Sequence, residues 1–218
     1  MLKQLRLATA AAALFAYVGQ AGAVPLSFAG TFTSDDNLRI FNFSVTAPGT
    51  VSIETFSYAG GTDPVRGAVA PGGFDPVFGL FTASGALVAV GDDGATRLDP
   101  VTGAAFDAFV SMTLTAGNYF IALAEYDNYP IGPTFASGFT RTGTGNFTST
   151  FGCSVGRFCD VNGFSRTGNF DVAISGTAVA AAPVPEPSTF ALMSVALAGV
   201  AAWARRRRTA NATQPAGC

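Results

Sequence analysis

The sequence predicts an all-β fold, a β-sandwich or jelly roll, for the body of the chain. Three observations lead to this class. Apolar and polar residues alternate through several short segments, turn-rich links join these segments, and none shows a sustained 3.6-residue period. The 26 glycines suit the turns, and the 20 phenylalanines suit the space between two sheets.

The alternation also predicts which strands pair. Residues 39–45 and 50–56 flank the turn sequence TAPG, which predicts a hairpin. Two further hairpins are expected where ASG joins VFGLFT to ALVAVG and where TAG joins FVSMTL to NYFIALAEY. Residues 170–175 form the closing strand. Long loops are expected over residues 57–75 and 126–168, where Gly, Pro, Thr and Asn dominate.

The N-terminus has the three parts of a secretory signal peptide. Lys3 and Arg6 form a basic region, residues 7–18 are apolar, and residues 21–23 form a small-residue cleavage pattern. The apolar run is too short to cross a bilayer, which needs about 17 residues or more. We therefore expect residues 1–23 to direct the chain to the Sec translocon and to be removed after Ala23.

A second hydrophobic segment lies near the C-terminus, after a linker over residues 178–184 that follows a domain over residues 24–177. Residues 189–204 carry no charge and run directly into four arginines, which favour the cytoplasmic side of a membrane. The segment is marginal as a transmembrane helix, which usually has about 20 apolar residues. A soluble hydrophobic helix is the alternative.

The order of Pro-Glu-Pro, an apolar segment and an arginine cluster resembles the PEP-CTERM sorting signal of Gram-negative bacteria. That resemblance implies an exosortase partner, a transient inner-membrane intermediate, and delivery to the cell surface or extracellular matrix. The chain departs from the family pattern in its tail, residues 209–218, because the family usually stops sooner. The matching residues are Pro185, Glu186, Pro187, Arg205, Arg206, Arg207 and Arg208.

Composition excludes several function classes. Between residues 24 and 183, thirteen acidic residues against six arginines give a net charge of −7, with no lysine. This acidity disfavours nucleic acid and anionic membrane surfaces as partners, and it is compatible with divalent cations. The absence of histidine excludes Ser-His-Asp and Cys-His catalysis and His-ligated metals. The single lysine, Lys3, leaves with the signal peptide, which excludes Schiff-base chemistry.

Cys153 and Cys159 are the two cysteines of the body of the chain. In an oxidising compartment a close pair predicts a local disulfide. A two-thiolate metal site is the alternative, but the body offers no further soft ligand. Cys218 follows the arginine cluster.

Acidic residues gather at predicted strand ends and in the adjoining loops. If the strands pair as predicted, these carboxylates can converge, and several hard oxygen ligands are what Ca²⁺ requires. They are Asp75, Asp92, Asp93, Asp99, Asp107, Glu125 and Asp127.

The same segments carry a second resemblance. GGFDPVFGLFTASGALVAVGDDG, followed by GNYFIALAEYDNY, resembles bacterial pre-peptidase C-terminal β-domains, and resembles still more the exported PEP-CTERM proteins built on that theme. The resemblance covers residues 41–175 and implies a calcium site formed by Asp75, Asp92, Asp93 and Asp127.

Other interpretations of these residues remain open. Aspartates in Asp-Gly and Asp-Pro contexts often serve only as turn formers. Glu54 or Glu125 paired with an aspartate would suit glycoside hydrolysis, although nothing local marks such a pair. Tyr126 and Tyr129 in YDNY offer aromatic faces for a glycan. We therefore predict a non-enzymatic surface or matrix protein that binds calcium, with a carbohydrate-binding module for exopolysaccharide as the alternative.

Overall fold

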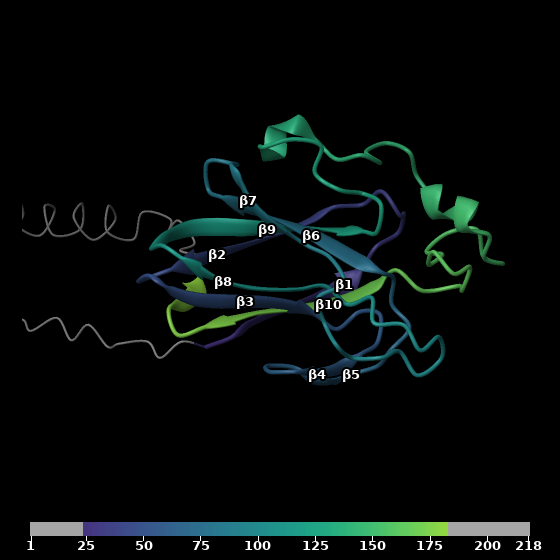
Figure 1. The fold of residues 1–218 in the computed structure, drawn as a ribbon, viewed down its shortest axis with the longest axis horizontal. Helices are drawn as coiled ribbons and strands as arrows, with labels where there is room; N and C mark the ends of the chain where they lie inside the picture. Colours follow the sequence, from purple (N-terminus) through teal and green to yellow (C-terminus); the bar gives the residue numbers. More distant parts are fainter. Residues whose placement is uncertain (1–23, 183–218) are drawn as a thin grey trace, which may run out of the picture. The chain divides into compact units, whose positions relative to one another are not determined.

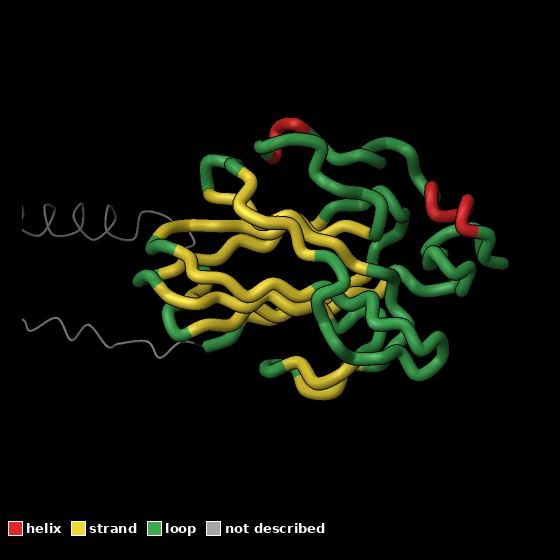
Figure 2. The backbone as a smooth tube through the Cα atoms, in the orientation of Figure 1, coloured by secondary structure: helices red, strands yellow, loops and turns green. Residues whose placement is uncertain are grey.

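The computed structural model describes residues 24–182, which form two facing β-sheets (Figures 1 and 2). The predicted signal peptide and the predicted C-terminal segment from residue 183 onward lie outside the described residues. Within residues 24–182, no helix has the length and apolar character needed to cross a membrane. The strands and 3₁₀ turns are β1 (Leu26–Thr31), β2 (Arg39–Val45), β3 (Gly49–Thr55), β4 (Gly61–Asp63), β5 (Gly67–Val69), β6 (Pro76–Thr82), β7 (Leu87–Gly91), β8 (Phe109–Leu114), β9 (Gly117–Glu125), η1 (Phe135–Ser137), η2 (Phe147–Phe151), β10 (Asn169–Gly176) and β11 (Val179–Ala181).

The two sheets are antiparallel and confirm the predicted all-β sandwich. Sheet A has the strand order β1-β10-β3-β8, and sheet B has the order β11-β2-β9-β6-β7. Strands β4 and β5 pair with each other in a separate hairpin, drawn beside the sandwich in Figure 1.

Period-two alternation places the core between the sheets, as a half-buried strand requires. Phe43 on β2 and Ile121 on β9 point inward from sheet B, while Ile53 on β3 and Ile174 on β10 point inward from sheet A. Each of these side chains is at most 1% exposed. Burial of such side chains contributes roughly 1.5–3 kcal/mol each.

A second apolar cluster covers the outer face of sheet B. Phe81 on β6 stacks on Phe120 of β9 with ring centroids 5.2 Å apart. Phe135 and Phe139, from the segment after β9, close over them. Strand β6 is therefore buried on both faces, which explains its almost continuous apolar sequence, VFGLF.

Of the three predicted hairpins, one is confirmed and two are wrong. Strands β6 and β7 do pair across the ASG turn. Strand β2, however, pairs with β9 in sheet B, while β3 pairs with β10 and β8 in sheet A. The turns after β2 and after β8 thus cross from one sheet to the other. Alternation shows which side chains face the core, and both a hairpin and a crossing satisfy that requirement.

Three strand regions differ from the sequence prediction. Strand β1 was not predicted, and residues 57–75, expected to be a loop, contain the β4–β5 hairpin. Residues 170–175 do form a strand, but it lies between β1 and β3 instead of closing an edge. Strand β11 falls within the predicted linker, and the Thr46 N–H beside it donates to the Ala178 carbonyl at 2.9 Å. The folded domain therefore extends beyond the predicted boundary at residue 177.

The long links gather at one end of the sandwich, at the right of Figure 1, and a buried arginine joins them. Arg166 is 8% exposed. Its guanidinium group donates to the carbonyls of Gly73 (3.0 Å) and Tyr58 (2.6 Å) and to both carboxylate oxygens of Asp99 (3.2 Å each). It also stacks 3.7 Å from the Tyr58 ring centroid. One side chain thus links three loops.

The buried Arg166–Asp99 pair leads to a stability prediction. We expect Arg166→Met to lower the free energy of unfolding by about 3–5 kcal/mol, because it leaves the Asp99 carboxylate buried without its counterion. Chemical denaturation of the full chain measures the loss. The double variant Arg166→Met with Asp99→Asn should recover part of it, since the uncompensated charge is gone. A single variant as stable as the wild type would contradict the role given to this arginine.

Candidate functional site: a carboxylate cluster at the loop end

Three carboxylates meet where the β6–β7 hairpin opens. Asp75 immediately precedes β6, and Asp92 and Asp93 immediately follow β7. Because β6 and β7 are antiparallel neighbours, the start of one strand lies beside the end of the other. One carboxylate oxygen from each aspartate lies within 4.8 Å of the other two. The structure thus brings together three of the four residues predicted to bind calcium.

Asp75 and Asp92 each have one buried carboxylate oxygen without a hydrogen bond within residues 24–182. Asp75 is 2% exposed, and its Oδ1 has no partner among the described residues. Asp92 Oδ1 is also buried without a partner in this part of the chain. Buried polar atoms are almost always satisfied, so two orphaned oxygens in one cluster indicate a missing partner.

The environment disfavours the charged forms of Asp75 and Asp93. Burial raises the pKa of Asp75 well above its ordinary value, and the negative charges of Asp93 and Asp92 raise it further. Partial burial, followed by the charges of Asp92 and Asp107, raises the pKa of Asp93 to about 6. A cation at this position would relieve both effects, because it supplies the opposite charge that the cluster lacks.

Other aspartates of the domain behave as the turn formers that the sequence left as an alternative. Asp63 accepts the backbone N–H groups of Val65 and Arg66 at 2.7 and 2.6 Å. Asp99 accepts that of Thr102 at 2.8 Å, and Asp160 accepts that of Phe164 at 2.9 Å. Asp75 and Asp92 have no such backbone hydrogen bond in the described part of the chain. The interpretation as turn formers therefore fits Asp63, Asp99 and Asp160, and it does not fit Asp75 or Asp92.

Asp127, the fourth predicted ligand, does not join the cluster. Its backbone is left-handed (φ 71°), and its carboxylate forms an ion pair with Arg141, whose Nε donates at 3.0 Å. Asp127 follows the end of β9, as the sequence predicted, but the turn directs its carboxylate to Arg141 in the 126–168 segment.

Glu125, the last residue of β9, lies opposite Pro76 and so beside the cluster. The N–H of Tyr126, which follows it, donates to the Asp75 carbonyl at 2.8 Å, so the two strand ends are joined. Glu125 is 1% exposed, and neither carboxyl oxygen has a partner within residues 24–182. Burial, with the charges of Asp35 and Asp75, raises its pKa well above the ordinary value. Glu54, the other glutamate of the body, instead pairs with Arg97.

The two tyrosines proposed as glycan contacts border the cluster. Tyr129 donates its hydroxyl hydrogen to Asp92 Oδ2 at 2.7 Å. Tyr126 meets the Tyr129 ring edge-on, with centroids 5.9 Å apart. Both side chains are half-buried. Burial first, and the Asp92 hydrogen bond second, raise the pKa of Tyr129, so its hydroxyl stays protonated.

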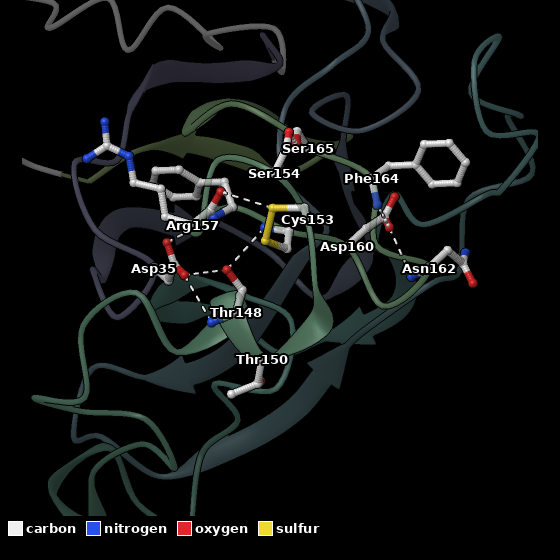
Figure 3. Close-up of a disulfide and its surroundings, with 12 residues drawn as sticks. Asp35, Thr148, Thr150, Cys153, Ser154, Arg157, Asp160, Asn162, Phe164 and Ser165 are labelled. Carbon is white, nitrogen blue, oxygen red and sulfur yellow. Dashed lines mark hydrogen bonds between the residues drawn. A yellow bond between two sulfur atoms is a disulfide. The ribbon is translucent and has the colours of Figure 1, made fainter.

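The predicted disulfide is present and lies in the long 126–168 segment (Figure 3). Cys153 and Cys159 are bonded, with Cα atoms 5.4 Å apart. Asp35 holds this region to the start of the domain: it accepts the N–H groups of Thr148 (3.0 Å) and Phe158 (3.1 Å). The disulfide confirms the sequence interpretation over the two-thiolate metal site.

The sequence was also compared with known proteins. Residues 183–208 match the family model described as the PEP-CTERM protein-sorting motif. No curated protein matches the chain significantly. Among solved structures, the pre-peptidase C-terminal domain of collagenase from Bacillus anthracis is similar at 11% identity with a TM-score of 0.35. The match covers 70% of this chain and 89% of that chain.

The chain is therefore an exported protein with an all-β sandwich domain followed by a sorting signal. More particularly, the chain carries a PEP-CTERM motif, the recognition signal for an exosortase, and it passes through the membrane for exosortase processing. This confirms the resemblance found at Pro185–Pro187 and the arginine cluster. Those residues and the predicted apolar segment lie outside the described part of the chain.

The sorting motif leads to a prediction about the mature protein. We expect the exported form to end before Arg205, because an exosortase processes the signal that this cluster belongs to. Intact mass spectrometry of the exported protein measures the end point. A variant with Pro185, Glu186 and Pro187 all replaced by Ala should keep residues 205–208. An exported wild-type chain that retains its arginines would contradict processing.

Proposed function

We propose that this protein is a non-enzymatic component of the cell surface or extracellular matrix, and that a bound divalent cation, calcium by its ligand chemistry, stabilises its loop end. Asp75, Asp92 and Asp93 would hold the ion. The observation that carries the proposal is the convergence of these three carboxylates with two buried oxygens left without partners.

The donor set fits calcium better than the common transition metals. All three side-chain ligands are hard oxygens, and Ca²⁺ takes six to eight of these at about 2.3–2.6 Å. The described residues contain no histidine, and both of their cysteines are in the disulfide, so the ligands that favour zinc or copper are not offered. Backbone carbonyls and water would complete the coordination.

The ion would act on stability because of where it sits. Asp75 immediately precedes β6, and Asp92 and Asp93 immediately follow β7, so one cation would fasten the open end of this hairpin. It would also neutralise carboxylates that otherwise repel one another in the folded state. The role proposed for the ion is therefore structural.

The test is a melting experiment on the full chain with calcium and with chelator. With calcium at a hundredfold excess over Kd, binding to the folded state alone adds about 2.7 kcal/mol, or a Tm increase of about 5–10 °C for a domain of this size. Asp75→Asn and Asp92→Asn should each abolish most of the increase.

Asp127→Asn is the matched control, because the sequence also predicted Asp127 as a ligand but its carboxylate pairs with Arg141. It should keep the full calcium-dependent increase. A wild-type Tm that is equal with calcium and chelator would refute the cation site. The exported, processed state would be unaffected by that result.

A second candidate function is recognition of an exopolysaccharide. The edge-to-face pair of Tyr126 and Tyr129 beside the carboxylates favours it, since aromatic rings supply large contact area at low entropic cost. Tyr126 is the better probe, because Tyr129 also binds Asp92.

A pull-down on the producing cell's own exopolysaccharide tests this candidate. Tyr126→Ala should weaken retention by about tenfold, the loss typical of a contact that matters. Phe164→Ala, which removes an exposed aromatic ring from the disulfide region, is the control and should bind as the wild type does. Absence of wild-type retention would reject a glycan role.

A further inference from the structure

A cavity separates the β4–β5 hairpin from sheet A. It has a volume of about 460 Å³ and lies between the β5 side of the hairpin and the β1–β10 edge of the sheet. Arg66, from the β4–β5 turn, and Asp171, from β10, are its charged lining residues. The hairpin has no strand pairing with either sheet among the described residues. Side chains, not a β-ladder, therefore hold it in place.

Beside this cavity, the hairpin meets sheet A through two buried carboxyl groups. Residues Phe170, Val172 and Ile174 of β10 point into the sandwich core, so Asp171 between them points outward to the hairpin. Asp63, at the end of β4, meets it within hydrogen-bonding reach. Asp63 is 1% exposed and Asp171 is 3% exposed.

The hydrogen bonds around this pair leave one position open on each carboxyl group. Asp63 Oδ1 accepts two backbone N–H groups of the β4–β5 turn, and Asp171 Oδ2 pairs with the Arg66 guanidinium at 3.1 Å. The remaining oxygens, Asp63 Oδ2 and Asp171 Oδ1, have no donor within residues 24–182. Two carboxyl groups within hydrogen-bonding reach, each with a buried oxygen that lacks a donor in this part of the chain, can be satisfied together by one hydrogen between them.

We propose that Asp63 and Asp171 share one proton, and that this proton is the latch that holds the β4–β5 hairpin against sheet A. When the proton passes to a base in solution, two buried carboxylates face each other, and the hairpin swings away from the sheet. The device is independent of the proposed cation site.

The surrounding charges agree with a single proton carried by Asp171. Burial, and then the contact with Asp63, raises the pKa of Asp171 to about 6, against an opposing effect of Arg66. Burial also acts to raise the pKa of Asp63, but the Arg66 N–H, the nearby Ser27 hydroxyl and the Val65 N–H outweigh it and leave that pKa lowered. Opposite shifts in two touching acids place the proton on one of them.

The other charged groups near the hairpin, among residues 24–182, are Arg97, whose Nε donates to the Gly60 carbonyl directly before β4 at 2.8 Å, and Glu54 of β3. Glu54 lies opposite Ala173, two residues from Asp171 along β10, and its carboxylate pairs with Arg97. Strand β1 contributes no charged side chain to this region. Asp63 and Arg66 are thus the groups that set the ionisation of Asp171.

The direction of the pH effect follows from these values. The closed form holds a proton that the open form, with an ordinary aspartate pKa near 3.8, has lost, so opening is favoured as pH rises towards about 6 and levels off above it. Between pH 5 and pH 7.5 the opening equilibrium should increase about tenfold.

Hydrogen exchange of the full chain tests the latch, because it measures the opening of backbone hydrogen bonds segment by segment. After correction for intrinsic exchange rates, protection of residues 59–70 should fall about tenfold between pH 5 and pH 7.5 in the wild type. Asp63→Asn should abolish this fall. Its carbonyl oxygen can still accept the two turn N–H groups, and its amide donates permanently to Asp171.

Two further variants keep the test decisive. Asp171→Asn should also remove the pH step, since no proton remains to be lost. Asp36→Asn, an aspartate bonded to Ser34 outside the hairpin, should retain it. Equal wild-type protection at both pH values, or a step that survives in both pair variants, would overturn the proposal. Loss of hairpin protection on adding chelator at pH 5 would also overturn it, because a cation would then bridge the pair.

Discussion

The loop end of this protein depends on one buried guanidinium group. Arg166 makes two hydrogen bonds to backbone carbonyls, a two-point contact with Asp99 and a stack on Tyr58. Lysine could not replace it, because only the planar, five-donor group satisfies all of these partners at once. The carbonyl of Gly73, two residues before Asp75, is among them, so the position of the carboxylate cluster rests on this contact.

The acidic excess of the domain explains much of the remaining chemistry. Thirteen carboxylates share six arginines and no lysine, so most cannot have a cationic partner. Asp107 instead accepts hydrogen bonds from the backbone N–H groups of Ser57, Tyr58 and Ala59. Asp35 likewise accepts those of Thr148 and Phe158. The acids that keep an unpaired buried oxygen within residues 24–182 are Glu125, the cluster acids Asp75 and Asp92, and the Asp63–Asp171 pair. We propose a cation as the neutralising partner of the cluster and a proton as that of the pair.

Both proposals suit a protein that an exosortase system exports. In each proposal the neutralising species comes from the surrounding medium and not from the chain. The composition of the medium would therefore set the stability of these contacts. The cation would fasten the β6–β7 hairpin, and the proton would fasten the β4–β5 hairpin. One hairpin belongs to sheet B and the other lies beside sheet A, and their responses can be separated by the variants described above.

The sequence by itself determined the sorting motif, the all-β class, the disulfide and the three acids of the cluster. These features are local: the motif is a fixed order of residues, the strands follow from period-two alternation, and Cys153 lies six residues from Cys159. Only the tertiary structure decided which strands pair, because an apolar face is buried equally in a hairpin and in a crossing between sheets. It likewise decided that Asp127 binds Arg141, and that Asp63 meets Asp171 from a strand more than a hundred residues away. Such long-range pairings arise from how the sheets pack, and neither spacing nor periodicity along the chain encodes them.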